Sequence, residues 1–154
     1  MNEVTARLDQ YDFRGVVERL REFGAYVTAA NNGNDSITNY TAGTDKINVN
    51  AFETVGALVN LFGATDANSA GDVFSLFGQS AGVADSSAGV IAAINGNTTW
   101  TDTAATSLLV ISDDNSSSVW EWTGDAQGDE ATGDTFTLMA TLDEAISNTG
   151  DIVI

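Results

Sequence analysis

The sequence predicts a mainly β fold: two packed sheets, as in a β-sandwich, with an N-terminal α-helix and one or two short helices. Three segments of the C-terminal half, 107–112, 119–123 and 134–142, are either apolar throughout or alternate between polar and apolar residues, as strands do. Strong helical periodicity is confined to residues 2–30. With 154 residues, 43% of them hydrophobic, the chain is long and apolar enough to form one globular core.

The N-terminal helical segment, residues 1–30, is predicted to hold one helix near 12–23. Its first 21 residues carry four arginines and four acidic residues, whereas residues 22–154 carry eighteen acidic residues against Lys46, and so the whole formal net charge of −17. The helix either closes the end of the domain core or docks on a neighbouring subunit, where opposite charges favour association. The second interpretation assigns the assembly interface to Tyr11, Phe13, Arg14, Val17 and Arg21.

The remaining residues, 31–154, are predicted to form an acidic, β-rich domain. A half-buried strand is expected at 43–50, where polar and apolar residues alternate. Apolar residues recur at helical spacing over 52–62, which predicts a short helix. The apolar run 73–77 fits either a strand or a buried helix, and the small residues of 89–95 predict a helix that packs closely against a sheet.

The strands of the C-terminal half differ in the faces that they are expected to bury. The nearly continuous apolar segment 107–112 predicts a central strand. Alternation over 119–123 places both of its tryptophans on one face of the sheet. The inward-facing residues of the last long strand are predicted to be Phe136, Leu138, Ala140 and Leu142.

The three tryptophans of the chain have two possible roles. Trp100, Trp120 and Trp122 either pack in the core or form an aromatic platform on which a sugar ring stacks. Buried aromatic side chains dominate protein cores, which favours the first role.

Two stretches of the chain carry motifs that point to a known class of proteins. Residues 107–154 contain, in order, a strand, an acidic turn, an aromatic strand, an acidic glycine-containing loop and a final strand before a short hydrophobic end. This order is similar to the terminal region of many type I secreted bacterial proteins. The other stretch, residues 31–52, resembles the last repeat of calcium-binding RTX proteins and the serralysin-type segment that follows it. The residues that carry this resemblance are Asp35, Ile37, Tyr40, Gly43, Asp45, Ile47 and Phe52. The resemblance implies calcium binding, type I export through an uncleaved C-terminal signal, and an extracellular or cell-surface location.

Three acidic clusters are the candidate calcium sites, because calcium binds six to eight oxygen atoms supplied by flexible loops. For the first cluster the alternative is a solvated acidic turn, and for the third it is an Asx-type turn before a strand. The second would act either alone or joined to the first across the hairpin. The first cluster comprises Asp125, Gln127, Asp129 and Asp134; the second comprises Asp113, Asp114 and Asn115; the third comprises Asp35 and Asp45.

Composition also argues against several classes of function. The chain has no histidine and no cysteine, which removes the usual general base and the thiolate and imidazole ligands, so we expect no enzyme activity. The acidic domain repels the phosphates of nucleic acids. The first thirty residues are charged throughout and no apolar run is long enough to cross a bilayer, so neither an N-terminal signal peptide nor membrane insertion is expected.

Together these observations predict a secreted, calcium-binding structural subunit. We expect it to self-assemble as a homo-oligomer or polymer into an extracellular filament or surface layer, after export by type I machinery. The alternative is a C-terminal secretion or binding module, such as an adhesin or carbohydrate-binding module, of a larger type I secreted protein.

Overall fold

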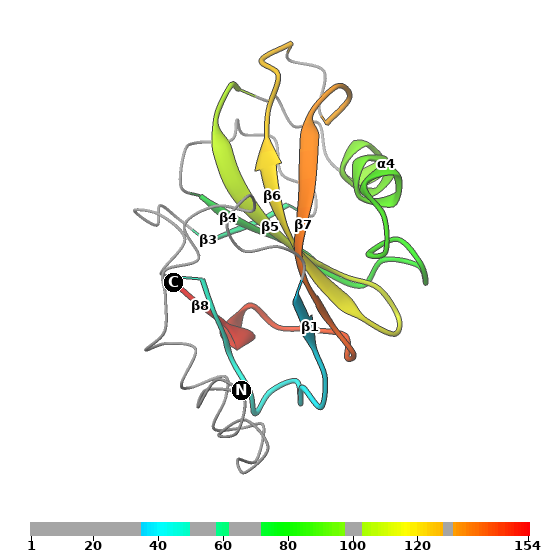
Figure 1. Ribbon diagram of the computed structural model, residues 1–154, viewed down its shortest axis with the longest axis vertical. Coiled ribbons are helices and arrows are strands. Elements are labelled where there is room, and N and C mark those ends of the chain that lie inside the picture. The colour runs from blue at the N-terminus through cyan, green and yellow to red at the C-terminus, as the bar shows by residue number, and fades with distance from the viewer. Residues whose placement is uncertain (1–34, 50–57, 62–71, 98–102, 128–130) are drawn as a thin grey trace, which may run out of the picture.

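The computed structural model describes residues 35–49, 58–61, 72–97, 103–127 and 131–154 (Figure 1). The predicted N-terminal helix lies outside these residues, as do Asp129 and Trp100. The same holds for the residues predicted to form the assembly interface, Tyr11, Phe13, Arg14, Val17 and Arg21.

A sheet of six strands, in the order β1-β7-β6-β5-β4-β3, forms the centre of the described domain. The bounds of its strands are β1 Asp35–Ile37, β3 Leu58–Asn60, β4 Val73–Leu76, β5 Thr106–Ser112, β6 Ser117–Thr123 and β7 Thr135–Leu142. Strand β6 is antiparallel to β5 and β7, whereas the pairs β1–β7, β3–β4 and β4–β5 are parallel. The mainly β prediction is confirmed, and the apolar segment 107–112 lies inside the sheet as β5.

The two faces of this sheet are covered by different elements. Helix α4, Ser87–Asn97, lies on one side, and a second sheet of two parallel strands, β2 (Ile47–Asn48) and β8 (Ile152–Val153), lies on the other, with the 3-10 helix η1 (Thr149–Asp151) leading into β8 (Figure 1). Each side has its own apolar cluster of buried residues. The predicted second sheet is therefore present but small, and a helix takes the opposite face.

A β-bulge in β7 divides that strand between the two clusters. Val119 pairs with Ala140 and the next residue, Trp120, pairs with Leu138, so Met139 is the extra residue of β7. Phe136 and Leu138 accordingly pack with the α4 side, while Met139, Ala140 and Leu142 pack with the β2–β8 side. The prediction that Phe136, Leu138, Ala140 and Leu142 share one inward face is wrong, because the bulge shifts the alternation by one residue.

Two further segments differ from or refine their predictions. The helix predicted over 52–62 is wrong at Leu58–Asn60, which is strand β3; residues 52–57 and Phe62 lie outside the described residues. The ambiguous run 73–77 contains strand β4, which is fully buried. A short apolar run has no periodicity that separates the two structures, so partners in the sheet decide.

The small-residue helix predicted over 89–95 is present as the longer α4, and it lies close to the chain that precedes it. Replacing Gly89 by alanine is expected to lower the free energy of unfolding by about 1–3 kcal/mol, because a Cβ there would lie 2.6 Å from the carbonyl oxygen of Val83. Gly96 of the same helix has open space at that position, so Gly96→Ala is the matched control and should be neutral or slightly stabilising. Urea denaturation measures both, and equal stability would contradict the close packing.

Candidate functional site

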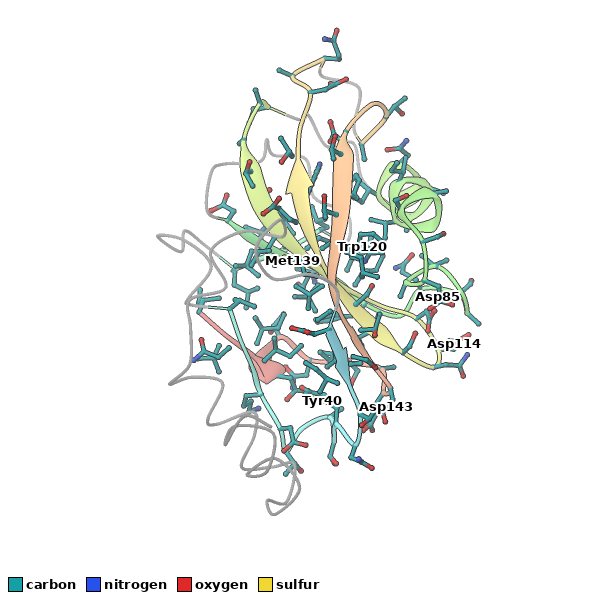
Figure 2. All side chains as sticks on the ribbon, viewed as in Figure 1. Tyr40, Asp85, Asp114, Trp120, Met139 and Asp143 are labelled. Carbon is teal, nitrogen blue, oxygen red and sulfur yellow. The ribbon has the colours of Figure 1, made fainter. Side chains whose placement is uncertain are left out.

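The densest cluster of charged groups in the described domain surrounds the loop 39–46, between β1 and β2. Four carboxylates meet this loop: Asp45 from the loop itself, and Asp143, Glu144 and Asp151 from the segment between β7 and β8. Together with the loop we call them the carboxylate clasp. Figure 2 shows Tyr40 of the loop beside Asp143.

Five successive backbone N–H groups of this loop donate to the four carboxylates. Successive backbone N–H groups of a loop can bind anions, and here the anions are carboxylate side chains of the same chain. The N···O distances are 2.7 Å for Asn39–Asp143, 3.2 Å for Tyr40–Asp143, 2.9 Å for Thr41–Asp45, 3.2 Å for Ala42–Glu144 and 3.0 Å for Gly43–Asp151. The clasp thus joins residues that are 102 to 108 positions apart wherever the carboxylate comes from the C-terminal segment.

The only basic residue of the acidic domain, Lys46, belongs to the same cluster. Its Nζ lies 3.0 Å from Oδ1 of Asp151 and 2.6 Å from the carbonyl oxygen of Gly150. The Asp151 side chain is 2% exposed and that of Lys46 is 44% exposed. The carboxylate of Asp151 is therefore held between the ammonium group and the N–H of Gly43.

The negative charge of the clasp acts on the Tyr40 hydroxyl, which donates to the carbonyl oxygen of Asp45 at 3.0 Å. Burial, and then the charges of Asp151, Asp45 and Glu144, raise the pKa of this hydroxyl well above its ordinary value. Tyr40 therefore stays protonated at physiological pH and acts as a hydrogen-bond donor.

Asp113, from the second predicted calcium cluster, caps the turn between β5 and β6. Its Oδ1 accepts from the backbone N–H of Asn115 and Ser116, each at 2.9 Å, and its Oδ2 accepts from the N–H of Gly82 at 2.8 Å. Burial raises the pKa of this carboxyl, but the backbone hydrogen bonds from Asn115, Ser116, Gly82 and Ala84 outweigh it and hold the pKa below its usual value. Its neighbours Asp114 and Asn115 are exposed.

The first predicted calcium loop, 125–134, is closed at its base by Asp134. One oxygen of Asp134 accepts from the indole N–H of Trp122, and the other accepts from the N–H of Asp125 at 2.8 Å. Asp125 in turn accepts from the N–H of Gln127 at 2.9 Å. Gly133 has a positive φ of 91°, and a Cβ there would collide with the Asp125 carboxylate, so the loop needs glycine at this position.

These contacts bear on the predicted calcium sites. The N–H groups around Asp113 and Asp134 direct partial positive charge at both carboxylate oxygens, an arrangement that suits turn capping better than a cation. Asp35 is exposed in β1, apart from Asp45, which caps the N–H of Thr41. Within the described residues no three acidic side chains come together as a metal site. The described parts of the clusters do not fit a calcium cage, and calcium binding stays a prediction.

Of the acids of the clasp, only Asp45 is among the site residues predicted from the sequence. Asp143, Glu144 and Asp151 follow the last predicted long strand, in the short C-terminal segment for which no site was predicted. The lone lysine of an otherwise acidic domain was the available signal, since an isolated charge of this kind usually has a specific partner. The partner itself depends on the parallel pairing of β2 and β8, which local sequence patterns do not reveal.

The core interpretation of two tryptophans is confirmed. Trp120 and Trp122 are 4% and 0% exposed and pack in the cluster on the α4 side of the sheet. The sugar platform is therefore wrong for these two residues.

Comparison with models of protein families, with curated proteins and with solved structures found no match. Among the helices that the structure describes, none is long and apolar enough to span a membrane.

Proposed function

We propose that this protein is a secreted structural subunit that assembles with copies of itself into an extracellular filament or surface layer, and that calcium promotes the assembly. The distribution of charged residues along the chain supports this proposal. Residues 22–154 hold eighteen acidic residues and a single base, Lys46, and that base binds Asp151 and Gly150 of its own chain.

The acidic domain has no spare positive charge with which to meet a second copy of itself. Its surface is negatively charged, and the exposed carboxylates include Asp35, Asp85, Asp114, Asp125 and Asp143. Like charges repel and oppose close approach of two copies. Assembly then requires either a cation between exposed carboxylates of adjacent copies or a basic segment from the partner.

The N-terminal segment has no net charge over its first 21 residues, but it holds the other positive side chains of the chain. Its four arginines lie within the first 21 residues, and opposite charges across an interface speed and orient association. We place Arg14 and Arg21 in the contact with the acidic domain of the neighbouring copy. Calcium, at exposed carboxylates, lowers the remaining repulsion.

Negative-stain electron microscopy and light scattering of the purified protein test the proposal. Ordered filaments or sheets are expected with millimolar calcium and are expected to dissolve after chelation. Sodium chloride at matched ionic strength is the control, because salt alone also screens exposed charges. Assembly in sodium chloride equal to that in calcium would contradict a specific role for calcium.

Charge-reversal variants test the interface. Arg14→Glu with Arg21→Glu should abolish assembly and leave the monomer folded, whereas Arg7→Glu with Arg19→Glu is the matched pair outside the predicted contact. Equal loss in both pairs would contradict the assignment of Arg14 and Arg21. Dispersed single particles of the unaltered protein in every condition would overturn the structural role and favour the binding module of a larger secreted protein.

A further inference from the structure

The contact between Lys46 and Asp151 is placed at the start of two paired strands. Ile47 of β2 is in register with Ile152 of β8, so Lys46 and Asp151 are the residues immediately before this pair on two parallel strands. Residues at matching positions of neighbouring strands lie within side-chain reach of each other. The contact therefore ties the first part of the described domain to its last strand.

The Lys46 and Asp151 side chains are each also held by another group of the protein. Nζ of Lys46 is fixed by the Gly150 carbonyl oxygen at 2.6 Å as well as by Asp151 Oδ1 at 3.0 Å. The second oxygen of Asp151 accepts from the N–H of Gly43 at 3.0 Å. Groups held in contact in this way have already lost most of the freedom that a reaction between them would cost.

As an ion pair, this contact would contribute little to stability. Lys46 is 44% exposed, and solvent screens the attraction between exposed charges. Asp151, by contrast, is 2% exposed, and burial penalises the charged form of a carboxyl group. An uncharged link between the two side chains removes that penalty.

We propose that Lys46 and Asp151 condense to form an isopeptide bond between the Lys46 side-chain nitrogen and the Asp151 side-chain carbon. In this step the Lys46 ammonium passes one proton to the Asp151 carboxylate, the neutral amine attacks Cγ of the resulting carboxyl group, and the Nζ–Cγ bond forms. The Gly43 N–H stabilises the charge that develops on Oδ2 of the tetrahedral centre. The Cγ–Oδ1 bond then breaks and the oxygen leaves as water, so the chain loses one water molecule and nothing is oxidised or reduced.

The second proton transfer needs a carrier, and we assign this task to Glu144. Its carboxylate binds the N–H of Ala42, the residue adjacent to the Gly43 whose N–H binds Asp151. In this role it accepts a proton from Nζ of the tetrahedral centre and gives it to the leaving Oδ1, as a general acid and base does. The product is a covalent bond that closes β2 onto β8.

Trypsin digestion of the unfolded protein followed by mass spectrometry tests the bond, because residues 22–154 contain only one position at which trypsin can cut. Trypsin cuts after unmodified lysine and arginine, and Lys46 is the only such residue in 22–154. The linked chain is expected to yield one fragment, 22–154, lighter than its sequence by one water molecule. Two separate fragments, 22–46 and 47–154, each with full sequence mass, would overturn the proposal.

Three variants sharpen the result. Lys46→Arg keeps the charge, cannot form the bond and should be cut at residue 46 in full. Asp151→Asn should still form the bond but lose ammonia in place of water. If this variant is folded by circular dichroism and is cut completely at Lys46, the proposed attack on Cγ of residue 151 is contradicted. Glu144→Gln should slow linkage; an unchanged rate would remove Glu144 from the reaction and leave the bond itself standing.

Discussion

Replacing Trp122 by alanine is expected to lower the free energy of unfolding by about 3–5 kcal/mol, as for other large buried aromatic residues. The indole is 0% exposed and stacks on Phe136, with ring centroids 5.5 Å apart, and it meets Phe74 edge-on at 5.3 Å. Its N–H also donates to the buried Asp134. The loss therefore combines a cavity in the cluster on the α4 side with a carboxylate that lacks one of its donors.

Urea denaturation followed by circular dichroism measures this loss. Trp122→Phe is the matched control, since it keeps most of the aromatic volume and removes the N–H; we expect it to cost about 1–3 kcal/mol, the range for leaving a buried polar group unpaired. A loss below about 1 kcal/mol for the alanine variant would contradict the central place of Trp122 in the core.

The second large effect is expected at Asp113. Its replacement by alanine should cost about 2–4 kcal/mol at neutral pH, because the N–H groups of Asn115, Ser116 and Gly82 lose a charged acceptor together. The same change removes the hydrogen bond from Gly82, in the loop before α4, to the β5–β6 turn. Asp114→Ala is the matched control: the residue is adjacent but exposed, and its removal should change stability by less than about 0.5 kcal/mol.

The effect at Asp113 also has a defined dependence on pH. Its native pKa lies below the value of 3.8 for the unfolded chain, so its contribution is fully present above that value and is lost as the pH falls through the native pKa. The difference in stability between the unaltered protein and Asp113→Ala should be constant near neutral pH and shrink in acid. A difference that persists unchanged in acid would contradict hydrogen bonding to the ionised form.

Local patterns predicted the elements whose partners are near in sequence. Segment 107–112 and its neighbour 119–123 form the antiparallel pair β5–β6 with the two tryptophans on one face, as alternation indicates. Helix α4 was predicted from its small residues, and the close approach of Val83 explains why position 89 is glycine. These features depend on contacts within one hairpin or one helix.

The features that the sequence did not predict depend on distant partners. Leu58–Asn60 becomes a strand because β4 pairs with it, although its apolar spacing fits a helix. The bulge at Met139 could not be placed from the alternation of β7, because Leu138, Met139 and Ala140 are all apolar and apolar residues suit either buried face. The clasp was not predicted either, because its carboxylates and its backbone N–H groups are brought together by the parallel pairs β1–β7 and β2–β8, whose members are distant in sequence.

The long spans of the clasp have a consequence for how the chain folds during synthesis. Among the described strands, β1 pairs with β7 and β2 pairs with β8, and the carboxylates of the C-terminal segment that bind the loop between β1 and β2 follow it by 102 to 108 residues. At a synthesis rate of roughly 5–20 residues per second, the early strands wait several seconds for their partners. Contacts this distant in sequence also slow folding itself. A nascent chain of this kind stays open until its last strands emerge, which leaves time for a chaperone or an export apparatus to engage it before the sheets close.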